Sequence, residues 1–493
     1  MERRAKIIAT IGPSSQDEET LRKMMEAGMD VARLNFSHGS HADHLESILK
    51  IRKLSKAFGK PVSILQDLQG PKLRVGVLPS SGIVLTAGQP VRLCPSESLP
   101  QAQDEFVQRS DEILKIPLEV PDLMGTLNHG DQVLLDDGHF ELVVESVGED
   151  YIQAVVKVGG ILKSHKGVNL PGIALKIPAL TEKDIDDLKF GLCNEIDYLA
   201  ISFVRRAEDI ELARSLIRKF APENSTVPII AKLERPEAID RLDEILNLAD
   251  GVMVARGDLG VETSLFSVPI IQKRIIQAAN KAGRIVITAT QMLESMISSP
   301  RPTRAEASDV ANAIFDGTDA VMLSGETAAG RYPVESIQVM AHIIHEAECH
   351  MTEWGHSDKL QIRSQDNATT ITLAAREMVN DFNVTNIAVF TKSGKTALMM
   401  SKTHPSVPIL ALTPEVRTLR KLGLYWGVVP FLVPPAYSVE TMLGHVENTI
   451  INSTGTIPGE QVVVICGYPI GLMRPPNFIL LHTIGESTSI NPD

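Results

Sequence analysis

The sequence lacks the features that would direct it to a membrane, to nucleic acid or to an oxidising compartment. No run approaches the roughly 18 apolar residues that a membrane span needs, and Met1–Lys6 carries no apolar signal region. The net charge of −13 leaves no excess of positive charge, so neither nucleic acid nor an anionic membrane is expected as a partner. The four cysteines are far apart and form no CxxC pair, which predicts free, mostly buried thiols. We therefore expect a soluble protein of the cytoplasm.

Several short motifs of common enzyme classes are also missing. The 13 histidines include no HExxH or other metal-ligand spacing, and neither a GxSxG elbow nor a GxGxxG fingerprint is present. The stretch Ser393–Thr396 has the end of a P-loop, but Val389 stands where the leading glycine belongs. A Walker A nucleotide site is therefore excluded.

The composition is that of an ordinary globular protein, with 43% hydrophobic and 22% charged residues. At roughly 150 residues per domain, the 493 residues predict about three domains. A large buried core is therefore expected.

A repeated rhythm of strand and helix organises most of the first 353 residues. Eight short β-rich runs are apolar enough to be parallel strands covered on both faces. Ser15–Glu18 and Thr303–Glu306 both fit the capping box that begins a helix. Eight parallel strands alternating with helices predict a (β/α)8 barrel, with an open doubly wound sheet as the alternative. The runs are Lys6–Ile11, Asp30–Phe36, Val62–Leu68, Tyr198–Phe203, Val227–Leu233, Gly251–Ala255, Arg284–Ala289 and Ala320–Leu323.

Two further regions interrupt or follow the barrel pattern. From about Pro71 to Ile177 the sequence alternates short strands and turns, with Asp136–Gly138 as one turn, and predicts a small all-β cap that closes over the barrel. A polar linker at Gly355–Asn367 precedes a second α/β pattern. We expect residues 1–70 and 178–353 to form the barrel, 71–177 the inserted cap, and 354–493 a C-terminal three-layer α/β domain.

Charged and hydroxyl side chains stand at the carboxyl ends of at least six of the eight runs, where barrel enzymes carry their chemistry. Alternate residues of a strand share a face. Taken alone, each pair is equally well a structural salt bridge, but the set together indicates a functional site. The groups are Arg33 with Asn35 and Ser37, Asp67, Lys232 with Glu234, Arg256 with Asp258, Thr288 with Thr290, and Ser324 with Glu326.

The mixture of side chains has a chemical logic. Glu234 and Asp258 offer hard oxygen ligands and leave positions for water and substrate, which suits Mg²⁺. Arg33, Lys232 and Arg256 are expected to supply fixed positive charge beside that ion. A metal ion with lysine and arginine is the set used in phosphoryl transfer, where catalysis is mainly positioning and charge stabilisation.

These residues resemble the pyruvate kinase family over almost the whole chain. The resemblance implies transfer of the phosphoryl group of phosphoenolpyruvate to ADP, giving pyruvate and ATP in glycolysis. It also implies a barrel, a β cap, a C-terminal domain, Mg²⁺ (or Mn²⁺ in its place) and a homotetramer. The matching strings are Lys6–Pro13, Ala32–Gly39, Ala231–Glu234, Ala255–Glu262, Ala289–Met296, Met322–Ala328 and His482–Gly485.

The resemblance implies a role for each residue at the barrel mouth. Lys232 would stabilise the phosphoryl group in transfer and the enolate that it leaves. Glu234 and Asp258 would hold Mg²⁺, and Arg33 would grip the transferring phosphate. These roles make Lys232, Arg33 and Thr290 the expected catalytic residues.

The resemblance also implies which residues bind the carboxylate of the substrate and which bind the nucleotide. Gly257, Asp258 and Thr290 would hold the carboxylate of the substrate, and Thr290 would help to protonate the enol through water. On the nucleotide side, ADP or ATP would contact Asn35, His38, Arg74 and Lys166. Lys166 lies in the cap, where Asp137 is a candidate partner for Arg74 on closing, although an ordinary turn aspartate is an equal alternative.

One departure from the family concerns the monovalent cation. Asn35, Ser37, Asp67 and Leu68 keep the K⁺-site pattern, but Lys72 stands where potassium-dependent members have glutamate. An ammonium group at that place could supply the charge that K⁺ otherwise brings. We therefore expect turnover to need Mg²⁺ but not K⁺, with a solvated Lys72 and a bound K⁺ as the alternative.

A second candidate site lies in the C-terminal region. A loop between a strand end and a helix start resembles the family's allosteric sugar-phosphate loop, and free amides, hydroxyls and lysine side chains could bind a phosphorylated effector there. Gly467–Pro476 would form the other wall, and a plain turn is the alternative. The loop residues are Thr391, Lys392, Ser393, Gly394, Lys395 and Thr396.

Two other functions stay open at this point. A Mg²⁺-dependent, enolate-forming barrel lyase or aldolase would share Lys232, Glu234 and Asp258, but would not need a nucleotide-facing cap with Arg74 and Lys166. A non-catalytic sugar-phosphate sensor would not need these groups to be intact.

Overall fold

A computed structural model of the chain describes residues 3–96, 113–120, 123–173, 178–224, 226–355, 366–472 and 474–486. Most of the expected linker at Gly355–Asn367 lies outside these ranges. All four cysteines are free, but only Cys94 and Cys466 are buried, so the expectation of mostly buried thiols is half right. None of the helices in these ranges is long and apolar enough to cross a membrane.

The eight expected parallel strands close into a barrel, which excludes the open sheet. Their order is β1-β17-β16-β15-β14-β13-β3-β2, with β2 pairing back to β1. Along β1, Ile7 and Ala9 join the core under the helices, whereas Ile8 belongs to the inner face. The strands are β1 Lys6–Ile11, β2 Val31–Asn35, β3 Ser63–Asp67, β13 Tyr198–Ile201, β14 Ile229–Leu233, β15 Gly251–Ala255, β16 Ile285–Ala289 and β17 Ala320–Leu323.

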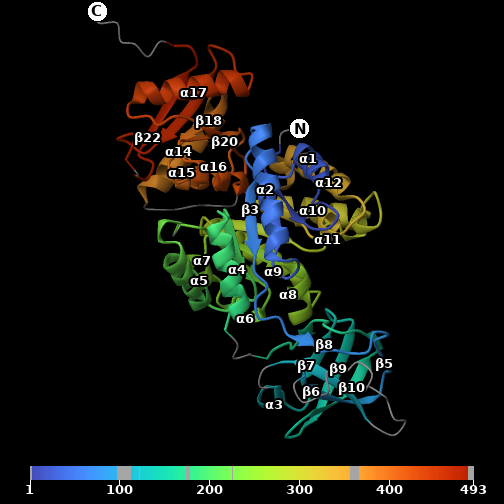
Figure 1. Cartoon of the computed structure of the whole chain (residues 1–493). Helices are drawn as coiled ribbons and strands as arrows, with labels where there is room; N and C mark the ends of the chain where they lie inside the picture. The colour runs from blue at the N-terminus through green and yellow to red at the C-terminus, as the bar shows by residue number, and fades with distance from the viewer. Residues whose placement is uncertain are drawn as a thin grey trace, which may run out of the picture.

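Helices surround the barrel as the sequence rhythm predicts (Figure 1). Thr303 caps α10 with a complete capping box. The expected box at Ser15 is wrong, because Asp17 caps α1 and the Ser15 hydroxyl accepts the Gly12 N–H instead. The α-helices are α1 Glu18–Ala27, α2 His41–Phe58, α4 Glu182–Cys193, α5 Ala207–Phe220, α6 Pro236–Asp240, α7 Leu242–Leu248, α8 Arg256–Glu262, α9 Val268–Lys281, α10 Arg304–Phe315, α11 Gly325–Ala328, α12 Pro333–Cys349 and α13 Met351–Trp354.

The segment between β3 and α4 forms the expected all-β cap, with a core of its own. A seven-stranded sheet has the order β12-β8-β9-β10-β6-β7-β4, and β11 pairs with β5. Asp136, Asp137 and Gly138 all have positive φ and form the turn between β8 and β9. The elements are β4 Arg74–Val75, β5 Ile83–Leu85, β6 Pro90–Pro95, β7 Leu114–Glu119, α3 Leu123–Thr126, β8 Gln132–Leu135, β9 Phe140–Val147, β10 Ile152–Val158, β11 Gly160–Leu162 and β12 Val168–Asn169.

The C-terminal region is a five-stranded sheet with helices, in the order β20-β19-β18-β21-β22. Only β22 runs antiparallel to its neighbour. In Figure 1 this region and the cap lie at opposite ends of the barrel. Three of its elements, β20, α16 and α17, were not predicted from the sequence. The elements are α14 Asn367–Asp381, β18 Val384–Phe390, α15 Lys395–Ser401, β19 Ile409–Thr413, α16 Val416–Lys421, β20 Val428–Leu432, α17 Val439–Ser453, β21 Gln461–Cys466 and β22 Phe478–Thr483.

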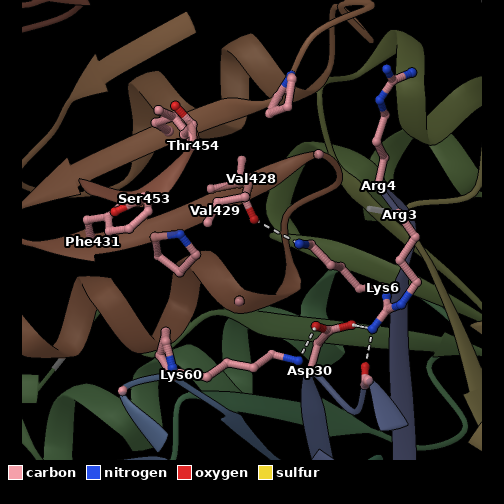
Figure 2. Close-up of a pocket in the computed structure, with 18 of the residues that line it drawn as sticks. Arg3, Arg4, Lys6, Asp30, Lys60, Val428, Val429, Phe431, Ser453 and Thr454 are labelled. Atoms are coloured by element: carbon pink, nitrogen blue, oxygen red, sulfur yellow. Dashed lines mark hydrogen bonds and ion pairs between the residues drawn. The ribbon is translucent and has the colours of Figure 1, made fainter. Parts of the chain in front are cut away.

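The C-terminal region docks where the barrel strands begin (Figure 2). Lys6 Nζ donates to the Val428 carbonyl oxygen at 2.8 Å. Nearby, the Asp30 carboxylate pairs with Arg3 at 2.6 Å and with Lys60 at 3.4 Å. Burial raises the pKa of Asp30, but these cations outweigh it and lower the pKa to about 2. A cavity of about 2130 Å³ remains along this seam.

A histidine is held uncharged at the same seam. His404 stacks on Trp426 with ring centroids 4.2 Å apart. Its two ring nitrogens are buried and have no hydrogen-bond partner among the described residues. Burial, reinforced by nearby Lys402, Arg376 and Arg4, lowers its pKa from 6.5 to about 3. The folded protein therefore binds a proton on this ring much more weakly than the unfolded chain does.

His404 is expected to make stability fall with acidity. The lowered pKa means that the unfolded chain binds this proton first, so its stability contribution is complete above about pH 6.5 and falls as pH drops toward 3. When the pH is lowered from 8 to 5, the free energy of unfolding measured in urea should fall by about 1–2 kcal/mol more in the wild type than in His404→Phe, whose ring cannot bind a proton. An equal pH dependence in both proteins would contradict this account.

Candidate active site at the barrel mouth

A cavity of about 420 Å³ lies between the carboxyl ends of the barrel strands and the cap. It gathers ten of the expected site residues from segments that are distant in the sequence. These are Arg33, Asn35, Ser37, His38, Lys72, Arg74, Lys166, Lys232, Glu234 and Asp258. The larger cavity at the other end of the barrel contains none of them in its lining.

Of the residues to which the resemblance gave a role or a cation site at the mouth, four do not line this cavity. Asp67 and Leu68, each 1% exposed, lie beneath it. Thr290 and Gly257 lie beside it, where the Thr290 Oγ1 accepts the Gly257 N–H at 2.8 Å. Thr290 has a φ of 65°, which is a strained value for a β-branched residue.

The Asp67 carboxylate holds the two main cations of the site. Its Oδ2 accepts from Arg33 Nε at 2.7 Å, and its Oδ1 lies 3.2 Å from Lys232 Nζ. Burial raises the pKa of Asp67, but Lys232 and Arg33 outweigh burial and hold the pKa below its ordinary value. Asp67 is therefore ionised, and it holds the charged groups of Arg33 and Lys232 beside each other at the cavity.

Lys232 and Glu234 form the next link of the same network. Lys232 Nζ lies 3.0 Å from Glu234 Oε1. Burial alone would lower the pKa of Lys232, but the carboxylates of Asp67 and Glu234 raise it above its ordinary value. The ammonium group therefore stays charged and supplies fixed positive charge at the floor of the cavity.

Glu234 and Asp258 form a pair of carboxylates that fits a divalent cation. The pKa of Glu234 is raised by burial and by the negative charge of Asp258, although Lys232 opposes the shift. A divalent cation between the two carboxylates would relieve this repulsion, and hard oxygen ligands suit it. Nowhere in the described ranges do three or more His, Cys, Asp or Glu side chains gather to hold a metal, so water or substrate would complete the coordination.

Arg256 does not supply charge beside that pair, contrary to the sequence expectation. Its guanidinium pairs with Asp309 Oδ2 at 2.6 Å and donates to the Thr290 carbonyl oxygen at 2.8 Å. The expectation used strand alternation, but α8 already begins at Arg256. Two residues apart on a helix differ by about 200° in direction, so Arg256 and Asp258 point to different sides.

Two other strand-end groups are structural. Thr288 is fully buried, and its Oγ1 lies 3.0 Å from that of Thr318. Glu326, also fully buried, accepts the backbone N–H groups of Leu293 and Ser324. Glu326 thus holds the loops that follow β16 and β17, Thr288 ties its strand to the start of β17, and neither residue lines the cavity.

The cap side of the cavity is basic, but its pairing differs from the expected one. Arg74 Nη1 donates to the His165 carbonyl oxygen at 2.9 Å, and Lys166 pairs with Asp136 at 2.8 Å. In this structure Asp137 lies 4.0 Å from Lys72, and its suggested pairing with Arg74 on closing stays a prediction. The Lys72 ammonium thus faces a cap carboxylate.

His38 faces the same cations. Burial lowers its pKa, and the charges of Arg74, Lys72 and Arg33 lower it further. The lowered pKa favours the neutral form of the ring at neutral pH.

Several lining residues were missed by the sequence analysis. Ser202 lay inside the expected run Tyr198–Phe203, but β13 ends at Ile201, so the strand-end rule applied to the observed end of β13 would have found it. The cap residues carry no comparable signal, because only folding brings them to the mouth. The missed lining residues are Gln69, Asp136, His165, Gly167, Ser202 and Phe203.

The expected effector loop joins β18 to α15 at the far end of the molecule from the cap. Thr391 Oγ1 accepts the Gly394 N–H at 3.0 Å, and Gly394 has a φ of 84°. Lys392, Ser393 and Lys395 are exposed, whereas Thr391 and Thr396 are buried. The loop therefore presents two ammonium groups and a hydroxyl to solvent.

Comparison with known proteins identifies the family. The family model of the pyruvate kinase barrel domain matches residues 2–337, and that of the pyruvate kinase alpha/beta domain matches residues 369–482. This chain belongs to the pyruvate kinase family. The expected fold class is confirmed, and the chain is a phosphotransferase of a family that generally uses a divalent metal ion. The lyase and sensor alternatives are set aside.

Similar full-length relatives support the same assignment. A pyruvate kinase of Geobacillus stearothermophilus is 43% identical over 492 residues, which cover 99% of this chain and 81% of that protein. One of Mycobacterium tuberculosis is 41% identical over 488 residues, covering 99% of each. One of Sporosarcina psychrophila is 41% identical over 487 residues, covering 98% and 81%.

Proposed function

We propose that the chain transfers the phosphoryl group of phosphoenolpyruvate to ADP, giving pyruvate and ATP, in the cavity between barrel and cap. One observation carries the proposal: the partly buried Lys232 and the carboxylates of Glu234 and Asp258 face the same 420 Å³ cavity that Arg74 and Lys166 approach from the cap. A lyase would use the first three groups, but the two cap cations suit the phosphates of a nucleotide.

The phosphoryl group would lie between Arg33 and Lys232. Asp67 fixes both cations at 2.7 and 3.2 Å, so they need not reorganise as charge moves from donor to acceptor. Preorganised charge of this kind is the main source of catalysis in phosphoryl transfer. Lys232 would also stabilise the negative charge of the departing enolate.

Glu234 and Asp258 would hold the divalent ion, which we propose is Mg²⁺, with Mn²⁺ as an alternative. When bound, it would neutralise charge on the phosphoryl and substrate oxygens. The protein's part is to fix the two carboxylates: the Phe203 N–H donates to Glu234 Oε2 at 2.7 Å, and Asp258 lies in the first turn of α8.

The substrate carboxylate would bind at Gly257, Asp258 and Thr290. The Thr290 hydroxyl, held 2.8 Å from the Gly257 nitrogen, would place a water that protonates the enol. Arg256 would fix this corner through the carbonyl of Thr290. The nucleotide would contact Asn35, His38, Arg74 and Lys166.

A coupled assay tests the proposed reaction. With phosphoenolpyruvate, ADP and saturating Mg²⁺, we expect pyruvate formation that depends on ADP. Lys232→Met should lower kcat by at least about 10²-fold, because it removes charge that stabilises the transition state. Lys157→Met, an exposed cap position, is the control and should leave kcat unchanged. Pyruvate formation without ADP, or none in the wild type, would refute the proposal.

We also propose that K⁺ is not required. Asn35, Ser37, Asp67 and Leu68 keep the family's K⁺-site pattern, but the Leu68 carbonyl already accepts from the Ser202 hydroxyl at 2.7 Å. Lys72 lines the cavity beside this group and brings a permanent positive charge.

Assays free of Na⁺ and K⁺ test this point. The wild type should keep at least half of its kcat without KCl. Lys72→Glu, which restores the residue of potassium-dependent members, should gain a stimulation by KCl of at least about tenfold, since the lost charge costs more than 1.4 kcal/mol at the site. Lys157→Glu makes the same change of charge elsewhere on the cap and should gain none. A wild type that stops without KCl would show that Lys72 does not replace K⁺.

A phosphorylated effector is proposed at residues 391–396. The three exposed polar side chains of Lys392, Ser393 and Lys395, between β18 and α15, support this proposal. Gly467–Pro476 would form the second wall. Binding here would act at the far end of the barrel from the cap.

A homotetramer is proposed as the working assembly. Leu265, Phe266 and Ile270 are 74%, 94% and 68% exposed around the start of α9, and apolar side chains that gather on a surface mark protein contacts. In sedimentation equilibrium the wild type should have the mass of four chains, and Phe266→Asp should have a lower mass. Leu49→Asp, at another exposed apolar position, should keep the mass of the wild type. An unchanged mass in Phe266→Asp would exclude this patch from the interface.

The domain boundaries and the location remain proposals. We propose a barrel of residues 1–70 and 178–353, a cap of 71–177 and a regulatory domain of 354–493, since the cap strands run from Arg74 to Asn169. We propose that the enzyme works in the cytoplasm, where its four free thiols would stay reduced.

A further inference from the structure

A two-residue turn after β13 touches both Lys232 and Glu234, although none of the roles above uses it as a unit. Ser202, 2% exposed, and Phe203 make this turn. Ser202 Oγ donates to the Leu68 carbonyl oxygen at 2.7 Å. The same oxygen accepts from Lys232 Nζ at 2.7 Å. Because a hydroxyl has one proton to donate, the bond to Leu68 fixes the lone pairs of Ser202 toward Lys232.

The second residue of the turn is strained. Phe203 has a φ of 54°, which is rare for a bulky side chain. This conformation directs its N–H to Glu234 Oε2 at 2.7 Å. The surrounding structure enforces it: a Cβ added to Gly70 would lie 2.9 Å from Ser202 Cβ and 3.0 Å from Phe203 Cδ2. Strain that the surroundings maintain is typical of functional sites.

Among the described residues, the Lys232 ammonium contacts three side chains, of which Ser202 is the closest. The others are Glu234 Oε1 at 3.0 Å and Asp67 Oδ1 at 3.2 Å. Both carboxylates attract the ammonium to themselves, whereas the uncharged hydroxyl of Ser202 fixes a third direction. Without that hydroxyl, the ammonium would stay charged but would move toward the carboxylates.

We propose that the Ser202–Phe203 turn is a positioning element that sets the Lys232 ammonium relative to the Glu234 carboxylate for phosphoryl transfer. This inference rests on the proposed function. Ser202 acts through Lys232, and the Phe203 N–H acts through Glu234. Because the charge remains in the site without Ser202, substrate binding survives, but transition-state stabilisation depends on placement to within about 1 Å and is lost.

Ser202→Ala tests the lysine arm of the turn. We expect kcat to fall about 10- to 100-fold, as for other residues that orient a catalytic group. The KM values for phosphoenolpyruvate and ADP should stay within about threefold, because the site keeps its charge. Ser336→Ala is the matched control, since Ser336 is fully buried and its Oγ donates to the Tyr332 carbonyl oxygen at 2.7 Å, away from the site. This variant should keep the wild-type kcat.

Two further measurements separate positioning from loss of structure. Ser202→Thr keeps the hydroxyl and should recover most of the lost kcat. Adding Ser202→Ala to Lys232→Met should lower kcat by less than about twofold, because Ser202 then has no ammonium to place; this cycle decides the point if the threonine variant does not fold. Mn²⁺ affinity, measured from the EPR signal of free Mn²⁺, should be unchanged in Ser202→Ala, since Glu234 keeps the Phe203 N–H.

Failure of this inference differs from failure of the proposed function. A wild type without ADP-dependent turnover would refute the function. An active wild type matched by Ser202→Ala would refute only the positioning role. A loss of Mn²⁺ affinity equal to the loss of kcat would also refute it, because the whole turn would then have collapsed. Fully additive effects of Ser202→Ala and Lys232→Met would show that Ser202 does not act through Lys232.

Discussion

The buried carboxylate of Asp67 is the group on which the mouth of the barrel depends. It is 1% exposed and contacts Arg33 and Lys232, two cations that would repel each other without it. Removing one partner of such a buried network leaves uncompensated charge in a medium of low dielectric constant, which is strongly destabilising. The arrangement therefore fixes the direction of both cations before any substrate arrives.

Backbone strain gathers around this network. Phe203, Thr290 and Gln291 all have positive φ although none is glycine. Each is held by a specific contact: Phe203 donates to Glu234, and the carbonyls of Thr290 and Gln291 accept from Arg256. Arg256 is in turn held by Asp309. The fold thus spends stability at the strand ends to aim a few polar groups, as active sites commonly do.

The opposite end of the barrel is devoted to docking. Lys402 of the C-terminal region pairs with buried Asp319, whose carboxylate also accepts the Val286 N–H at the start of β16. The Tyr198 hydroxyl donates to the Lys421 carbonyl oxygen at 2.5 Å. Strands that carry catalytic groups at one end are therefore fixed at the other end by the C-terminal region.

The sequence by itself determined the barrel and named ten residues that the structure brings to one cavity. Continuous apolar runs lie where β1, β15 and β17 begin and end, because strands buried on both faces need such runs. Polar residues at or just beyond the ends of two runs, those of β14 and β15, pointed to Lys232, Glu234 and Asp258. Alternation failed at Arg256, where the chain had already turned into a helix.

Only the tertiary structure decided which groups meet. Ser202 binds Leu68 and Lys232, Asp137 faces Lys72, and His404 stacks on Trp426. A local pattern cannot predict such contacts, because their partners are distant in the sequence and meet only when the barrel closes and its two neighbours dock. The sequence specifies which residues stand at the strand ends. Closure of the barrel specifies which of their side chains form ion pairs and hydrogen bonds with one another.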